Sequence, residues 1–422
     1  MQCGEWNTLQ EEVTLATPGP KRASGGVLQS HKLSQSLETK EVRFSSGFAD
    51  LDEVLGGGLV AGGVVLLAGQ PGIGKSTLLM QLASTISKAA SVLYVSGEES
   101  ERQVAMRAER LGADGAQLQL ASSNSADDVA TTMQKQSYDV VVVDSIQTVA
   151  VEGVSSAPGS VSQITNSTSV LLTAAKRTNT VLILVGHVTK EGSIAGPKIL
   201  EHIVDVVLQL EGDAYGGFKL LRASKNRFGP TSEAAILEMT AQGLTPVENP
   251  SAALLEERQI ADGSVVLATI EGTRPLLVEV QALVNKTSYG YPKRAASGID
   301  LNRVNLLVAM LEKRTKLNLA EHDIYINIVG GIRLKDPAAD LAICMAIGSA
   351  AKGLKLRKNA VVFGEVGLSG EVRHVVHAEK RIAEAKKMGF DCAVGPKQRS
   401  GKKQAFLYEA RDVREALNEF LR

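Results

Sequence analysis

Residues 69–76 read Gly-Gln-Pro-Gly-Ile-Gly-Lys-Ser, which is a complete G-x-x-x-x-G-K-S motif. An apolar run, 64–68, comes directly before the motif, and a helix-like stretch, 76–90, follows it. A strand, a glycine-rich loop and a helix in this order are typical of a phosphate-binding loop, whose backbone N–H groups converge on a phosphate. The helix N-terminus adds a partial positive charge. The alternative is a glycine-rich turn that merely carries Lys-Ser, and the context favours a site for ATP or GTP.

Each position of this motif has an expected role. We expect Lys75 to reach the β- and γ-phosphates of the nucleotide, and the Ser76 hydroxyl to ligate Mg²⁺. The other contacts to the nucleotide are expected from the loop and from the start of the helix, namely from Gly69, Gly72, Gly74 and Thr77.

Strand-like and helix-like runs alternate on both sides of the loop. The expected strands are 64–68, 92–96, 118–121, 140–144, 181–185 and 204–210, and the expected helices are 78–88, 101–111, 126–136 and 161–177. Continuous apolar strands joined by crossover helices predict a mostly parallel α/β sheet. Two further runs, 218–223 and 234–239, predict an antiparallel extension with a turn at Gly229-Pro230.

A second domain is expected after Asn249-Pro250-Ser251, because the order of the elements changes there. We expect strands at 265–270, 276–284 and 324–329, and helices at 302–313, 338–351 and 379–388. The predicted organisation is a mobile tail at 1–40, a nucleotide-binding domain at 41–248 and an α/β or α+β domain at 249–422. A chain of 422 residues is also too long for one ordinary core.

The composition indicates a globular protein with no overall charge bias. Apolar residues make up 44% of the chain, and the basic and acidic residues both total 46, so any DNA-binding surface has to be local. The three cysteines, Cys3, Cys344 and Cys392, lie too far apart for a disulfide framework, which favours a reducing compartment. Neither a membrane span nor a signal peptide is evident. We therefore expect a cytoplasmic protein with no membrane partner.

Three further polar positions follow strands of the expected sheet. Asp144 ends the run Val-Val-Val-Val-Asp, and we expect it to hold Mg²⁺ through water, unless it only caps a loop. Glu98 and Glu99 follow the strand 92–96, where ligand sites of open α/β sheets gather. Glu98 is the first candidate for the base that activates water and Glu99 is the second. Alternatively, both acids only stabilise the next helix through its dipole.

The strand 181–185 leads into Gly-His-Val-Thr-Lys at 186–190. His187 or Thr189 could sense the γ-phosphate from that edge of the sheet, although a polar strand end without function fits the spacing equally well.

The pentapeptide Lys-Asn-Arg-Phe-Gly at 225–229 follows a strand and precedes a turn. It is either a solvated basic turn or a pair of cations, Lys225 and Arg227, presented to phosphate. That phosphate would belong to a neighbouring subunit's nucleotide or to a nucleic-acid backbone. A cation supplied in trans can raise the rate of phosphoryl transfer by about 10³–10⁵.

Several segments together resemble one family. Residues 48–59, Phe-Ala-Asp-Leu-Asp-Glu-Val-Leu-Gly-Gly-Gly-Leu, are similar to the entry of RecA-superfamily ATPases, including KaiC-like proteins. The string 225–229 matches the KNRFG signature of the RadA (Sms) family of bacterial DNA-repair proteins, and residues 186–192 and 195–198 also resemble that family. The resemblance runs from about Cys3 to the C-terminus.

This resemblance implies a RecA-like ATPase joined to a C-terminal domain similar to the Lon protease domain, assembled as a hexameric ring. It implies an ATP-driven, Mg²⁺-dependent motor in recombinational repair, which acts with RecA on single-stranded DNA and branched intermediates. It also implies that Lys225 and Arg227 couple ATP to DNA work across subunits, and that Glu98 is the catalytic glutamate. The competing hypothesis is a KaiC-like ATP-driven regulator of protein partners.

The chain departs from this family at its start. RadA proteins begin with a four-cysteine zinc element, whereas here only Cys3 and its flank resemble the last cysteine. One cysteine does not provide the four ligands of a structural zinc, so we expect no zinc site. The element is either truncated or lost, and functions assigned to it do not carry over.

The segment 330–340 resembles the part of Lon-type enzymes that carries the nucleophile. Such peptidases need a Ser activated by a Lys. The matching positions here are Ala338 and Ala378, and the nearby Lys380 would face another direction on a helix. We therefore expect a binding and assembly scaffold and no protease.

A local excess of cations lies between residues 286 and 316, with Tyr289 and Tyr291 interleaved. Cations that follow phosphates, with aromatic rings for stacking, suit single-stranded DNA. The alternative is a solvated face with pairs across a subunit interface. The DNA-contacting residues that we expect here, in addition to Lys225 and Arg227, are Lys286, Lys293, Arg294, Arg303 and Arg314.

Overall fold

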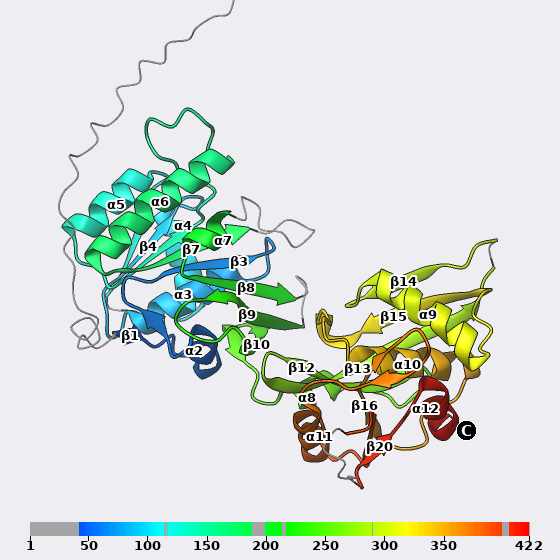
Figure 1. The fold of residues 1–422 in the computed structure, drawn as a ribbon. Helices are drawn as coiled ribbons and strands as arrows, with labels where there is room; N and C mark the ends of the chain where they lie inside the picture. The colour runs from blue at the N-terminus through cyan, green and yellow to red at the C-terminus, as the bar shows by residue number, and fades with distance from the viewer. Residues whose placement is uncertain are drawn as a thin grey trace, which may run out of the picture. The chain divides into compact units, whose positions relative to one another are not determined.

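The computed structural model describes residues 42–113, 115, 117–187, 199–212, 217–288, 290–398 and 405–421. Two large sheets, one of nine strands and one of seven, form the framework of this part of the chain (Figure 1). The tail that we expect at 1–40 lies outside the described residues, as do Thr189 and Tyr289. No helix in the described ranges has the length and apolar character that a membrane span needs.

The nine-stranded sheet has the order β11-β10-β9-β8-β3-β7-β6-β4-β5. Its strands from β8 to β5 run parallel, and β9, β10 and β11 extend it in antiparallel fashion. Both parts of the prediction for this sheet are confirmed. The bounds are β3 (Val64–Gly69), β4 (Val92–Ser96), β5 (Leu118–Ser122), β6 (Val140–Asp144), β7 (Val181–His187), β8 (Val206–Gly212), β9 (Phe218–Asn226), β10 (Ala234–Thr240) and β11 (Gly243–Pro246).

Both faces of the nine-stranded sheet are covered by helices, which explains its continuous apolar strands. Val65 and Leu67 of β3 pack into one apolar core with α2, α3 and α4, whereas Leu66 packs into a second core with α5 and α6. The covering helices are α2 (Ala49–Leu55), α3 (Lys75–Ile86), α4 (Glu101–Arg110), α5 (Ala126–Lys135), α6 (Val161–Thr178) and α7 (Ile199–Ile203). A small pair of strands, β1 (Arg43–Phe44) and β2 (Leu59–Val60), flanks α2.

The seven-stranded sheet has the order β14-β15-β13-β12-β16-β19-β20. Its central helix α10 (Ala339–Lys352) is buried on every side from Ala339 to Ser349. The strands are β12 (Ser264–Glu271), β13 (Arg274–Lys286), β14 (Arg294–Ser297), β15 (His322–Ile328), β16 (Ala360–Val362), β19 (Cys392–Gly395) and β20 (Leu407–Glu409). The other elements are α8 (Pro250–Leu255), α9 (Leu301–Thr315), α11 (Ala378–Lys387), α12 (Val413–Phe420), the 3-10 turn η1 (Val329–Gly331) and the hairpin β17 (Glu365–Val366) and β18 (Val372–Arg373).

The sequence-based elements all occur, with small differences at their ends. The strand expected at 204–210 begins two residues later, because α7 occupies Ile199–Ile203. The strands β1, β2, β11, β14, β16, β17, β18, β19 and β20 and the helices α2, α7, α8 and α12 were not predicted. The expected domain boundary at 248 falls between β11 and α8, but Val42–Arg422 make up one compact unit, so the division into domains stays a prediction.

Candidate nucleotide-binding and hydrolysis site

Four neighbouring parallel strands, β3, β7, β6 and β4, end at the same edge of the nine-stranded sheet. The register pairs Gly69 with His187 and Ser96 with Asp144, so these strand ends lie level with one another. The phosphate loop follows β3, and Glu98 lies in the loop that follows β4. The structure therefore brings together the candidates that the sequence placed at the ends of separate strands.

The phosphate loop turns sharply from β3 into α3. Gly72 has a φ of 76° and Gly74 has a φ of 113°, values that residues with a side chain rarely adopt. Gly74 is the N-cap of α3, so Ser76 and Thr77 lie in the first helical turn. The free N–H groups of that turn and the helix dipole favour an anion here.

The Lys75 ammonium group lies within this loop. The residue is 5% exposed, and Nζ donates to the carbonyl oxygens of Gly69 at 2.9 Å and Gln70 at 3.0 Å. Burial lowers the pKa of Lys75, and the negative charges of Asp144 and Glu98 offset part of that effect. Because two carboxylates favour its charged form, the Lys75 ammonium is suited to bind the phosphates of a nucleotide.

The two neighbouring acids at the end of β4 point to different partners. Glu98 Oε1 accepts a hydrogen bond from Ser145 Oγ at 2.8 Å, and His187 Nε2 lies 3.9 Å from the same oxygen. The Glu99 carboxylate is bound instead to the guanidinium of Arg107 in α4. Glu98 thus faces the strand ends, whereas Glu99 is held by Arg107 of the helix that follows it, and this geometry favours Glu98 as the base.

His187 is placed where the sequence suggested a sensor of the γ-phosphate. Burial is the main factor that lowers its pKa, and the charge of Lys75 lowers it further. The carboxylates of Glu98 and Asp144 act in the opposite direction. The imidazole is therefore biased towards its neutral form, which can accept as well as donate a hydrogen bond.

Asp144 has a partner that sequence reasoning missed. Its Oδ2 accepts a 2.6 Å hydrogen bond from the hydroxyl of Tyr94, a residue of β4 that is only 1% exposed. Burial, followed by the negative charge of Asp144, raises the pKa of Tyr94 well above its usual value, so the phenol stays protonated and donates. The available signal was a tyrosine in a continuous apolar strand, because a buried hydroxyl needs a partner.

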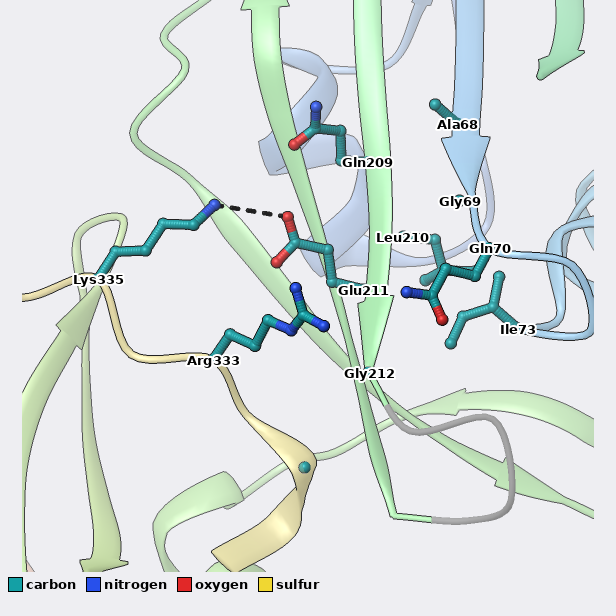
Figure 2. Close-up of a pocket in the computed structure, with 11 residues that line it drawn as sticks. Ala68, Gly69, Gln70, Ile73, Gln209, Leu210, Glu211, Gly212, Arg333 and Lys335 are labelled. Carbon is teal, nitrogen blue, oxygen red and sulfur yellow. Dashed lines mark ion pairs between the residues drawn. The ribbon is translucent and has the colours of Figure 1, made fainter. Parts of the chain in front are cut away.

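A second set of residues beside the loop was also missed. A pocket of about 360 Å³ is lined by the start of the phosphate loop, the end of β8, and Gly331, Arg333 and Lys335. Figure 2 shows Arg333 and Lys335 extending from one segment towards Glu211 of β8, and Lys335 Nζ lies 3.6 Å from Glu211 Oε1. These segments are far apart in the sequence, so no local pattern connects them.

Lys225 and Arg227 lie at the edge of the sheet opposite the phosphate loop of the same chain. Asn226, at the end of β9, pairs with Val206 at the start of β8, and Val206 is level with Val65 near the start of β3. The phosphate loop follows the other end of β3. These two cations therefore do not reach their own nucleotide site, and a catalytic role for them requires a neighbouring subunit.

Both cations have partners within the chain. Lys225 Nζ donates to the carbonyl oxygens of Glu201 at 2.7 Å, His202 at 3.2 Å and Val204 at 2.8 Å, at the end of α7. Burial and the nearby charge of Arg227 lower the pKa of Lys225. The Arg227 side chain is 56% exposed, and its guanidinium lies 3.1 Å from Asp205 Oδ1.

The other residues of the KNRFG string fix the loop in place. Asn226 Nδ2 donates to the carbonyl oxygen of Val54 at 3.2 Å, at the end of α2. Gly229 packs so closely on Gly56 that a β-carbon at Gly229 would lie 2.6 Å from the Gly56 α-carbon. The asparagine and the glycine are therefore explained by docking against α2.

The expected DNA-contacting cations divide into two groups. Lys286 ends β13 and pairs in register with His322, while Arg294 begins β14 and pairs with Ile324, so both lie near the start of β15, with Lys293 beside them. The other two cations lie on α9.

On α9, Arg303 is engaged within the chain. Its Nε donates to Asp340 Oδ1 at 2.9 Å, and Asp340 is 1% exposed. Hydrogen bonding to Asp340 raises the pKa of Arg303. Arg314 is exposed in the last turn of α9, and its Nε donates to the carbonyl oxygen of Leu368 at 3.4 Å. The geometry favours a structural role for Arg303 and leaves Arg314 accessible.

The positions matched to a protease dyad hold small buried side chains. Ala338 is the N-cap of α10, Ala378 is the first residue of α11, and they are 0% and 5% exposed. The Ala338 N–H donates to Asp336 Oδ1 at 3.0 Å, and Asp336 Oδ2 lies 2.7 Å from the fully buried Arg381 guanidinium. Lys380 donates to the carbonyl oxygen of Thr273 at 3.0 Å. The space beside Ala338 thus holds an ion pair.

The described residues contain no group of three or more His, Cys, Asp or Glu side chains arranged to hold a metal ion. Cys3 lies outside the described residues. The Ser76 hydroxyl and the Asp144 carboxylate supply hard oxygen donors of the kind that Mg²⁺ takes together with nucleotide phosphates.

Known proteins match both halves of the chain. A family model described as "AAA domain" matches residues 31–193, and one described as "Subunit ChlI of Mg-chelatase" matches residues 299–399. The DNA repair protein RadA of Bacillus subtilis is 47% identical over 401 residues, which cover 93% of this chain and 88% of that protein. The DNA repair protein RadA of Pseudomonas aeruginosa is 46% identical over 398 residues, covering 93% and 88%. A crystal structure of the RadB recombinase aligns with 49% of this chain and 100% of its own at 25% identity, with a TM-score of 0.39.

Proposed function

The chain belongs to the RadA family of DNA repair proteins, and we propose that it is a DNA-dependent ATPase that processes branched recombination intermediates. Its fold is that of a RecA-like P-loop ATPase with a C-terminal Lon-like domain, as predicted. The observation that carries the proposal is the convergence of Lys75, Glu98, Asp144 and His187 at one sheet edge.

The phosphate loop and the strand ends would act together on bound Mg²⁺–ATP. The loop amides and Lys75 would hold the phosphates, and Ser76 and Asp144 would hold Mg²⁺, which would supply neutralisation of the phosphate charge. Glu98 orients the attacking water and accepts its proton. Its hydrogen bond from Ser145 holds the carboxylate at the strand end. His187 lies beside Glu98 and is suited to sense the terminal phosphate.

The KNRFG loop is proposed to act between subunits of a hexameric ring. Because this loop lies away from the phosphate loop of its own chain, we expect it to contact the nucleotide of a neighbouring subunit or DNA. Arg227 is the more exposed cation and is suited to direct contact with phosphate. Lys225 donates hydrogen bonds to carbonyl oxygens at the end of α7, so a displacement of that helix would also displace the KNRFG loop.

Single-stranded DNA is proposed to contact the cations of the C-terminal half. Lys286, Lys293 and Arg294 gather near the start of β15, and the exposed ring of Tyr291 lies on the connection between β13 and β14. Each lost phosphate contact should reduce the salt slope of binding by about one. Replacing these three cations by alanine should therefore weaken binding at every sequence, whereas the exposed Lys355, before β16, serves as a matched control.

We propose that the C-terminal half is a scaffold without peptidase activity. A Ser and a Lys would be needed in place of Ala338 and Ala378, and an Asp336–Arg381 ion pair occupies the adjacent space. Ala338→Ser alone should therefore create no activity. Cleavage of casein by the wild-type protein would contradict this proposal.

The experiment that tests the proposed function follows branch migration. A labelled joint molecule, made by RecA from a circular single strand and a linear duplex, is incubated with the protein and ATP. We expect extension of the joint molecules by the wild type and none by Lys75→Ala. Absence of extension in both would contradict the proposal and favour a KaiC-like regulator of protein partners.

A further inference from the structure

Tyr94 is a buried residue of the ATPase core whose hydroxyl reaches the edge where the nucleotide site lies. In the register of β4 and β6 it pairs with Val142, two residues before Asp144. Both Tyr94 and Val142 belong to the core on the α3 side of the sheet, the side from which Lys75 approaches. The Tyr94 ring therefore runs towards the strand end beneath Asp144 and meets it at 2.6 Å.

This hydrogen bond makes the two oxygens of the Asp144 carboxylate inequivalent. Oδ2 is taken by the phenol, and among the described residues Oδ1 has no hydrogen-bond partner. A carboxylate with one oxygen held by a buried donor cannot rotate freely, so its other oxygen is fixed in direction. Hydrogen bonds from a hydroxyl to a carboxylate are short and stronger than neutral ones, and a buried ring adds rigidity.

We propose that Tyr94 is a positioning residue for the metal-holding acid: it fixes Asp144 so that Oδ1 faces the water shell of Mg²⁺. This proposal rests on the proposed Mg²⁺–ATP site and not on the proposed action on DNA. Partners of this kind behind a metal-holding group typically change metal affinity or activity by about 10–100-fold when they are removed.

Tyr94→Phe is the direct variant, because it removes one hydroxyl and keeps the ring in the core. Tyr138→Phe is the matched control: Tyr138 is 7% exposed, and its hydroxyl donates at 2.7 Å to the side-chain oxygen of Gln119 or of Gln136. It precedes β6, at the edge opposite Asp144. Each variant thus removes one hydrogen-bonded hydroxyl from a largely buried tyrosine, and only one of them touches the site.

The measurement is Mn²⁺ binding to the ADP complex, followed by electron paramagnetic resonance, together with the Mg²⁺ concentration that gives half-maximal hydrolysis. For Tyr94→Phe we expect about tenfold weaker metal binding, with unchanged ADP binding in EDTA and a fold that stays intact at the assay temperature. Tyr138→Phe should leave metal binding unchanged. Metal affinity within twofold of wild type in Tyr94→Phe, or an equal loss in Tyr138→Phe, would overturn the proposal.

A double-mutant cycle with Asp144→Asn keeps the test decisive if Tyr94→Phe is unstable. The effect of Tyr94→Phe on metal affinity should vanish when Asp144 is already replaced, because the tyrosine acts only through that carboxylate. An undiminished effect in this background would refute positioning through Asp144. A wild-type ADP complex that binds no Mn²⁺ would instead refute the Mg²⁺–ATP site itself, so the two failures are distinguishable.

Discussion

Glu98 and Glu99 are adjacent acids, and replacing each by glutamine tests the hydrolysis site most sharply. Glu98→Gln keeps the size of the side chain and can still accept the hydrogen bond from Ser145. It removes the charge that would take a proton from water. Glu99→Gln instead weakens the ion pair with Arg107 and leaves the strand end unchanged.

The expected magnitudes differ widely. A positioned general base contributes about 10²–10⁴ to the rate, so kcat of Glu98→Gln should fall by that factor, which is about 3–5 kcal/mol in the barrier. The Glu99–Arg107 pair is partly exposed, and such pairs contribute up to about 1 kcal/mol to folding stability. Glu99→Gln should therefore keep a kcat close to that of the wild type.

The assay is kcat at saturating ATP and Mg²⁺, combined with the dissociation constant of a non-hydrolysable ATP analogue. The analogue should bind Glu98→Gln nearly as well as wild type, because the base acts after binding. If Glu98→Gln keeps most of its activity, or if Glu99→Gln loses more, then the assignment of the base is wrong.

Three further predictions concern other parts of the molecule. Lys75→Ala should abolish hydrolysis, because it removes the cation at the phosphates, and near-normal turnover in a phosphate-release assay would refute the site. Lys225→Ala or Arg227→Ala should keep ATP turnover but lose joint-molecule extension, and normal extension would count against coupling through this loop. Asp336→Ala should lower the free energy of unfolding by about 3–5 kcal/mol, because it leaves the buried Arg381 unpaired. Denaturant titration measures this loss of free energy. A change within about 0.5 kcal/mol, as is usual for substitutions at exposed positions, would contradict the prediction.

The fold of the nucleotide-binding half was predictable because its signals are local. Runs such as 140–144 are buried on both faces and read as continuous apolar strands, and Ser100 begins α4 with a capping box to Gln103. The short strands β16 and β20 have three residues each, too few to show a period. Their pairing depends on contacts with distant strands, which no local pattern specifies.

The site was predictable as a set of residues, but not in its finer geometry. The sequence indicated Glu98 before Glu99 from their place after a strand and from resemblance, and the structure separates them through Ser145 and Arg107. The Tyr94–Asp144 contact depends on which strands are neighbours. The sequence also could not show that Lys225 and Arg227 lie at the sheet edge opposite the phosphate loop of the same chain. That placement follows from the antiparallel pairing of β9 with β8.

The proposed DNA-dependent ATPase activity is best tested by measuring ATP hydrolysis by the purified protein with and without single-stranded DNA. The assay is run at low and at moderate salt, because contacts to phosphate weaken as salt rises. We predict that DNA stimulates turnover and that the stimulation falls at moderate salt. Turnover that is the same with and without DNA at both salt concentrations would contradict a DNA-dependent ATPase.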